Sequence, residues 1–315
     1  MAFTTPVALI IFNRPDLTEL VFSAIAQVKP QKLLVIADGP RFPEEAEKCQ
    51  KTRSVIEKVD WDCEVLKNFS EKNLTSPIRC SSGLNWVFSE VEEAIILEDD
   101  CLPTQSFFYF CQELLEHYRS DERVMHVSGN NFQFGQQRAN YSYYFSRYTH
   151  SWGWASWRRA WKHFDLDMKT WPEFKAEYLL SSTCIDPFEQ KYWTEIFDRV
   201  WSKQSIHWDY AWLYSCWSQN GLSILPSSNL VSNVGFRSDG TRTKNENSSL
   251  AKIATNDIWT MRHPPLVSRH QKADSYTFDY IFGGNSMKVK PTLIKRTLRK
   301  LSTTREKLKL WFSVL

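Results

Sequence analysis

The stretch AIILEDD at residues 94–100 decides how the rest of the sequence is interpreted. Its first four residues are apolar, which is typical of a strand covered on both faces in a parallel sheet. Two similar runs precede it, VALIIF at residues 7–12 and LLVIA at residues 33–37. Segments with apolar residues at helical spacing separate the three runs. This alternation predicts an α/β protein built on a Rossmann-like, mostly parallel, doubly wound sheet.

Polar residues follow each of the three predicted strands. Asn13 and Arg14 come after the first strand, Asp38 after the second, and the acidic triplet 98–100 after the third. Because parallel strands end at the same edge of a sheet, and ligands bind outside that edge, we expect these residues to form a site. No glycine-rich phosphate loop accompanies them, which argues against a dinucleotide-binding or ATPase site.

Three consecutive carboxylates are costly, because each raises the pKa of its neighbours unless a cation is close. Mn²⁺ or Mg²⁺ would relieve that cost, since both ions take oxygen ligands and keep positions open for substrate phosphates. The alternative is an acidic cluster that only favours the N-terminus of the helix predicted to start after Thr104. The triplet alone does not decide between these readings.

The composition excludes several classes of protein. The 315 residues are 42% hydrophobic and 24% charged, as in an ordinary globular protein, so disorder and collagen-like structure are excluded. A net charge of +3 is too small to indicate nucleic-acid binding. The seven cysteines show no metal-site or CxxC spacing and are predicted to be free thiols in a reducing cytoplasm. The apolar run near the N-terminus is too short for a signal peptide or a membrane span.

Several motifs, in order along the chain, resemble one known family. IILEDDCLP at residues 95–103, followed by FFYF at 107–110, is similar to the donor site of N-acetylglucosaminyltransferase I and its bacterial relatives, which are inverting glycosyltransferases of the GT-A fold. HWDYAW at 207–212 resembles the family's Trp-Asp-Asp-Trp segment, with a tyrosine in place of the second acid. Residues 225–236 and the tryptophan-rich block 150–161 also resemble family segments. The resemblance covers about residues 5–245.

The resemblance implies a role for each acidic or basic residue at the predicted edge. It places Arg14 at the nucleotide diphosphate, Asp38 at the uracil edge, Glu98 at the donor sugar, Asp99 at the ribose and Asp100 at Mn²⁺ or Mg²⁺. The donor is then a nucleotide-sugar, with a UDP-sugar favoured.

Arg79 is a second candidate for phosphate binding, because it lies in the loop before the helix predicted near residues 81–90. The alternative reading is an ordinary surface arginine.

An inverting transfer needs a general base that takes the proton of the acceptor hydroxyl. Asp209 is the catalytic candidate, flanked by Trp208 and Trp212, whose bulk would desolvate it. The alternatives are a structural carboxylate at this position, or His207 or His150 as the base.

Aromatic side chains next to polar groups suit sugars, which offer apolar C–H faces and many hydroxyls. The sequence contains 14 Trp, and four of them are candidates for acceptor binding: Trp152, Trp154, Trp208 and Trp212. Core packing is the competing explanation for each. The loop at residues 238–243 is predicted to close over the donor and exclude water.

Two other functions stay open at this point. A sugar nucleotidyltransferase also uses a Rossmann-like sheet and acidic metal ligands, although it normally carries a glycine-rich N-terminal loop. A non-catalytic sugar-binding module would use the tryptophans to bind glycan and the triplet only as a helix cap.

The chain is expected to divide into a GT-A catalytic domain at residues 1–287 and a basic amphipathic tail at residues 288–315. The tail holds nine Lys or Arg and one Glu, with apolar residues between them. This pattern favours an anionic membrane surface on the cytoplasmic side, and a lipid-linked glycan as acceptor. The alternative is a helix packed on the body of the protein.

Overall fold

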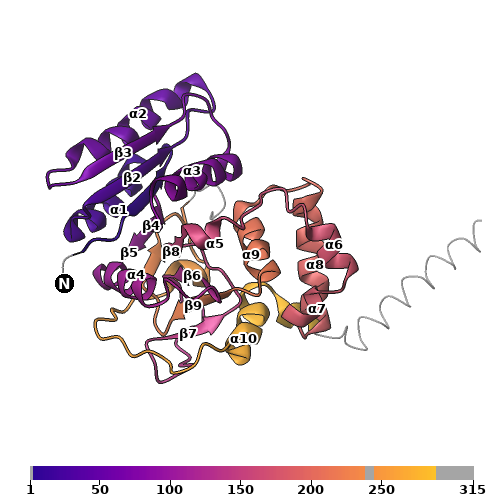
Figure 1. The fold of residues 1–315 in the computed structure, drawn as a ribbon. Helices are drawn as coiled ribbons and strands as arrows, with labels where there is room; N and C mark the ends of the chain where they lie inside the picture. Colours follow the sequence, from indigo (N-terminus) through magenta and orange to yellow (C-terminus); the bar gives the residue numbers. More distant parts are fainter. Residues whose placement is uncertain (1–2, 238–244, 289–315) are drawn as a thin grey trace, which may run out of the picture.

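The computed structural model describes residues 3–237 and 245–288 (Figure 1). Eight strands form one sheet in the order β3-β2-β1-β4-β8-β6-β9-β7. They are β1 (Val7–Ile11), β2 (Lys32–Ala37), β3 (Glu64–Phe69), β4 (Glu93–Glu98), β6 (Val124–Ser128), β7 (Tyr143–Ser146), β8 (Trp154–Trp157) and β9 (Leu222–Pro226). Strands β5 (Cys101–Pro103) and β10 (Val231–Asn233) form a separate antiparallel pair.

Strands β1 to β4 are parallel to their neighbours among themselves, and β6 is parallel to β9. Only β8, which lies between β4 and β6, and β7, at the edge, run antiparallel to their neighbours. The three apolar runs that predicted the fold are β1, β2 and β4. The predicted α/β class with a mostly parallel sheet is confirmed.

Helices cover both faces of the sheet and extend beyond one of them (Figure 1). They are α1 (Pro15–Val28), α2 (Ala46–Ser54), α3 (Ser76–Glu90), α4 (Gln105–His117), α5 (Arg158–Trp161), α6 (Trp171–Ala176), α7 (Leu180–Thr183), α8 (Pro187–Trp201), α9 (Trp208–Ser218), α10 (Gln271–Ile281) and α11 (Gly284–Lys288). Short 3-10 turns lie at Pro43–Glu45, Val55–Lys58 and Ser249–Lys252.

Alternate residues of the central strands enter two different cores, as the two-residue period of a strand requires. Val7 and Leu9 of β1 pack with α1 and α4 on one face. Ala8 and Ile10 pack with α3 and α9 on the other face. Both faces of β1 are therefore dry, and the polar residues that follow β1, β2 and β4 lie where these strands end.

Helix α9 is buried on nearly all sides and joins the sheet to an outer helical layer. Trp208 and Trp212 pack against the sheet, whereas Tyr214 and Trp217 pack with α6, α8 and α10. Figure 1 shows α6, α7 and α8 on the far side of α9 from the sheet. An apolar surface all round is typical of a helix inside a core, and it explains much of the unusual tryptophan content.

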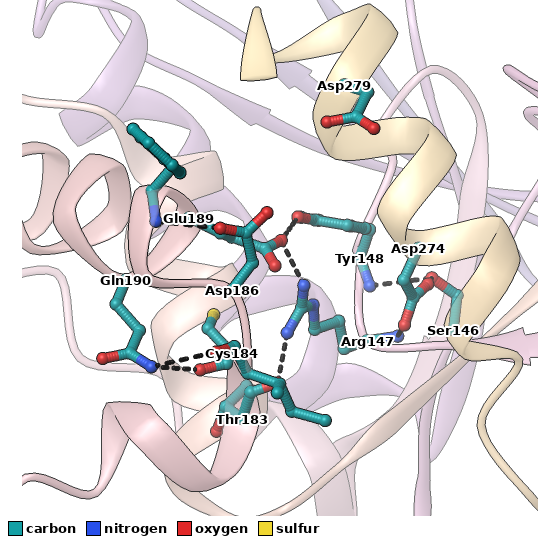
Figure 2. Close-up of polar contacts among 12 residues, drawn as sticks. Ser146, Arg147, Tyr148, Thr183, Cys184, Asp186, Glu189, Gln190, Asp274 and Asp279 are labelled. Atoms are coloured by element: carbon teal, nitrogen blue, oxygen red, sulfur yellow. Dashed lines mark hydrogen bonds and ion pairs between the residues drawn. The ribbon is translucent and has the colours of Figure 1, made fainter. Parts of the chain in front are cut away.

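A buried charge network ties the outer layer to the end of β7 (Figure 2). Arg147 is 3% exposed and forms an ion pair with Glu189 of α8, which also accepts a hydrogen bond from the hydroxyl of Tyr148. Asp274 of α10 accepts hydrogen bonds at 2.5 Å from the hydroxyl of Ser146 and from Nε of Arg269. Two arginines thus neutralise two acids inside the protein.

All seven cysteines lie within the described residues, and none of them forms a disulfide there. Within residues 3–237 and 245–288, no helix has both the length and the apolar character needed to cross a bilayer. The loop 238–243 and nearly all of the basic tail lie outside the described residues, so their expected roles and the boundary near residue 287 stay predictions.

Replacing Glu189 by Ala should reduce the free energy of unfolding by about 3–5 kcal/mol, because the charge of Arg147 would stay buried without its partner. Replacing Glu64, whose side chain is 57% exposed in its pair with Lys32, should cost less than about 1 kcal/mol. Urea unfolding of both variants measures the difference. Equal losses in the two variants would show that the network contributes no more than a surface pair.

Candidate functional site

The predicted edge residues meet at the carboxyl ends of β1 and β4. The ladder pairs Ile10 with Glu98, and the amide of Asp99 donates to the carbonyl of Ile10 at 3.0 Å. Arg14 follows β1 and is the N-cap residue of α1, whose first residue is Pro15. The parallel register therefore brings Arg14 and the triplet together, as the sequence predicted.

Helix α1 begins at Pro15, because proline already has the backbone angle of a first helical residue and needs no amide donor. Asp16 lies in the first turn and forms an ion pair with Arg237.

Arg14 is the cation that faces the triplet. Its Nη1 lies 3.0 Å from Oδ2 of Asp100 and its Nε 3.3 Å from Oδ2 of Asp99, with a further contact from Nη2 to Oδ1 of Asp99. These carboxylates raise the pKa of Arg14 although burial opposes the shift. The guanidinium is therefore a fixed positive charge at the end of β4.

The guanidinium of Arg14, the one that pairs with the triplet in the described part of the chain, does not balance three carboxylates. Burial, with Asp100 and Asp99 next in importance, raises the pKa of Glu98 to about 8. Burial also raises the pKa of Asp99 to about 6, with Arg14 opposing the shift. Excess negative charge at an edge with oxygen ligands suits a hard divalent cation such as Mn²⁺ or Mg²⁺.

The described residues contain no cluster of three or more metal-ligating side chains. One or two carboxylates are nevertheless a sufficient protein contribution for an ion that also binds substrate phosphates. Asp100 is more open to that use than Asp99, because its side chain is 13% exposed against 5% for Asp99. The residues present therefore fit such an ion.

The β5–β10 pair holds the backbone of Asp100. The amide of Val234, just after β10, donates to the carbonyl of Asp100 at 2.8 Å. A Cβ at Gly235 would lie 2.3 Å from Oδ2 of Asp100, so only glycine allows the carboxylate its present place. The sequence contained this signal, a glycine in the segment 225–236, but its link to Asp100 required the fold.

Asp209 reaches the same edge from α9. It lies in the first turn of the helix, and its charge contributes to the raised pKa of Glu98. His207 is near, with Nδ1 at 3.8 Å from Oδ1 of Asp209. Asp209 and Trp152 both line a cavity of about 180 Å³ beside the edge.

Asp38 and Arg79 are held by the protein itself. Oδ1 of Asp38 accepts hydrogen bonds from the backbone amides of Gly39 and Leu74, both at 2.9 Å. These bonds hold the loop after β3 against the end of β2. Arg79 is 5% exposed and donates to the carbonyls of Ala37 and Asn68 at the ends of β2 and β3. Arg79 is therefore a buried structural arginine rather than a surface one, and phosphate binding by it stays a prediction that these contacts do not favour.

Three of the four tryptophans predicted at the acceptor lie in the core. Trp154, Trp208 and Trp212 are at most 3% exposed and pack around one another, with ring centroids of Trp154 and Trp208 5.9 Å apart. Their packing explains their presence without an acceptor. Trp152 is half-buried and is the one that lines the cavity.

A buried histidine links α9 to the segment before β8. The indole Nε1 of Trp212 donates to Nδ1 of His126 at 3.2 Å, so the proton of His126 is on Nε2, which donates to the carbonyl of His150 at 3.0 Å. Burial lowers the pKa of His126 to about 3, which keeps the ring neutral. This role could not be predicted from the sequence, because His126 stands in a mostly apolar strand.

Comparison with known proteins adds little to this geometry. No protein-family model and no curated protein matches the sequence. Among solved structures, galactosyltransferase LgtC in complex with donor and acceptor sugar analogs is 9% identical, with a TM-score of 0.33 over 55% of this chain and 66% of that one. Mouse xyloside xylosyltransferase 1 is 11% identical, with a TM-score of 0.32 over 67% and 81%. The 4-diphosphocytidyl-2C-methyl-D-erythritol synthase from Anaerococcus prevotii is 10% identical, with a TM-score of 0.32 over 55% and 77%. Likenesses at this level concern the fold and assign no activity.

The acidic cluster predicts a pH dependence of stability in metal-free protein. Glu98 and Asp99 hold their protons to higher pH in the folded chain than in the unfolded one, so the unfolding free energy should fall as pH rises from about 4.5 to about 8. Urea unfolding in the presence of a chelator measures this slope. Glu98→Gln removes the main titrating group and should flatten the curve, whereas an unchanged slope in that variant would contradict the assignment.

Proposed function

We propose that this chain is a metal-dependent inverting glycosyltransferase related to the N-acetylglucosaminyltransferase I group. It transfers a sugar, of the hexose or N-acetylhexosamine kind, from a nucleotide-sugar donor to a hydroxyl of a glycan or lipid-linked glycan. The observation that carries the proposal is the meeting of Arg14, the triplet and Asp209 at one edge of the sheet.

The donor side is argued from charge. Arg14 offers a planar set of N–H donors that suits phosphate oxygens, and binding a diphosphate would draw it from the carboxylates it now contacts. A divalent ion held by Asp100 would stabilise the charge that develops on the departing diphosphate. By the family resemblance, Glu98 would contact the donor sugar and Asp99 the ribose. UDP is the preferred nucleotide because of Asp38, which the family resemblance places at uracil.

The acceptor side is argued from position. Asp209 reaches the edge from a different helix, beside a cavity that the donor-side residues do not line. A carboxylate there can take the proton of an acceptor hydroxyl while the hydroxyl oxygen attacks the sugar from the face opposite the diphosphate. A single displacement of this kind inverts the anomeric centre.

The proposal extends to the rest of the chain. Residues 1–287 would form the catalytic domain, and the basic tail at residues 288–315 would bring the protein to an anionic membrane surface where a lipid-linked acceptor is presented.

Asp209→Asn should lower kcat for transfer from a UDP-sugar by about 100-fold or more, while UDP binding stays within twofold, because the amide cannot accept the proton. Asp62→Asn, an exposed carboxylate outside the site, serves as the control. Near-normal turnover by Asp209→Asn would disprove its role as the base.

Asp100→Asn should abolish the dependence of donor turnover on Mn²⁺, since the carboxylate that holds the ion is lost. Identifying the released product distinguishes a glycosyltransferase from a nucleotidyltransferase. Release of UDP indicates transfer or hydrolysis of the donor, whereas release of pyrophosphate from a nucleoside triphosphate and a sugar 1-phosphate indicates a nucleotidyltransferase. If neither a nucleotide-sugar nor a nucleoside triphosphate with a sugar 1-phosphate is turned over, only the sugar-binding module remains.

A further inference from the structure

The cavity beside Asp209 has the character of a built site. It measures about 180 Å³ and lies between the segments that flank β6 and β8, the start of α9, and residues of α8 and α10. Its wall combines aromatic rings, among them Trp152, Phe132 and Tyr210, with a few polar side chains. Such a mixture is typical of a pocket that binds a small organic molecule by its faces and orients it by hydrogen bonds.

Four side chains in this wall carry buried polar atoms that have no hydrogen-bond partner within the described residues. The atoms are Nδ2 of Asn130, Oγ1 of Thr149, Nε2 of His150 and Nε1 of Trp193. A buried polar group left without a partner costs about 1–3 kcal/mol, so few are retained without a reason. Their concentration around one cavity indicates that a ligand supplies the partners.

The orientation of Asn130 is fixed by its other contact. Its Oδ1 accepts the backbone amide of Trp152 at 3.0 Å, which only an oxygen can do. The NH₂ group is therefore the end left without a partner. Like the indole of Trp193 and the hydroxyl of Thr149, it can donate to an oxygen of a ligand.

The charge of the wall selects among oxygen-rich ligands. Among residues 3–237 and 245–288, no lysine or arginine lines the cavity, and Asp209 is the one carboxylate in its wall. Arg147, which precedes the cavity residue Tyr148 in the sequence, is already paired with Glu189. Burial, together with His126, lowers the pKa of His150 to about 3, so this ring is neutral. An anionic ligand would lose its hydration, find no cation and face Asp209.

We propose that this cavity binds the sugar ring of the acceptor that receives the transferred sugar, and that this ring is uncharged. Pyranose rings present apolar C–H faces to the aromatic wall and several oxygens to the donors. Rings that carry a carboxylate, sulfate or phosphate are excluded. The inference rests on the proposed function for the identity of the ligand as acceptor, but the binding itself needs no donor.

The test is binding of simple glycosides to the full-length protein without any nucleotide. The probes are the methyl pyranosides of glucose, galactose, mannose and N-acetylglucosamine, and the methyl glycosides of glucuronic and galacturonic acid. Ligand-observed NMR titration gives each dissociation constant. We expect at least one neutral glycoside to bind, and the uronic acid forms to bind at least about tenfold more weakly.

Thr149→Val keeps the shape of the side chain and removes a hydroxyl that has no hydrogen-bond partner within the described part of the chain. The substitution should leave the melting temperature unchanged or higher, and it should weaken the binding of the neutral glycoside about tenfold. Thr18→Val is the matched control, because Oγ1 of Thr18 is also buried without a partner but lies in α1, away from the cavity. Trp152→Ala should also weaken binding, whereas Trp259→Ala, at a residue 59% exposed outside the cavity, should not.

The outcomes separate this inference from the proposed function. Binding of a neutral glycoside that Thr149→Val weakens supports the inference, even if no nucleotide-sugar is turned over. Three results would overturn it: no neutral glycoside binds, the uronic acid forms bind as tightly, or both cavity variants bind like the wild-type protein.

Discussion

The excess of negative charge at the end of β4 is the constraint on which the rest of the site depends. Three carboxylates follow a buried strand, and among the described residues one guanidinium, that of Arg14, forms ion pairs with them. Burial makes this arrangement expensive, because the protein interior screens like charges poorly. A fold that only needed stability would not keep it. The cluster is better understood as a place prepared for a cation and an anionic substrate that arrive together.

The surrounding structure positions this cluster and completes it. The β5–β10 pair and Gly235 hold Asp100, while α9 brings Asp209 to the same edge from the helical layer. The buried tryptophans serve this second task, because Trp208 and Trp212 fix α9 against the sheet. His126 then connects Trp212 to the carbonyl of His150 and so positions one wall of the cavity beside Asp209. Residues that pack the core therefore also set the geometry of the site.

The sequence predicted what local pattern controls. Apolar runs marked β1, β2 and β4, and parallel pairing was enough to place Arg14 with the triplet. It could not distinguish a tryptophan that lines a cavity from one in the core, because Trp152 and Trp154 are only two residues apart, and Trp154 is buried in β8 whereas Trp152 lies in the segment before it. The role of Arg79 depends on its hydrogen bonds to carbonyls at the ends of two strands. The role of Asn130 depends on its hydrogen bond with the amide of Trp152, which lies 22 residues further along the chain. Such roles arise from tertiary contacts that no spacing along the chain records.

The most direct measurement is a calorimetric titration of UDP into the protein in Mn²⁺ and, separately, in a chelator. If the acidic cluster holds a cation that binds the diphosphate, the affinity for UDP should be at least about tenfold higher in Mn²⁺, and uridine without phosphates should show no such dependence. Equal affinity for UDP with and without the ion, or no binding in either condition, would contradict the account.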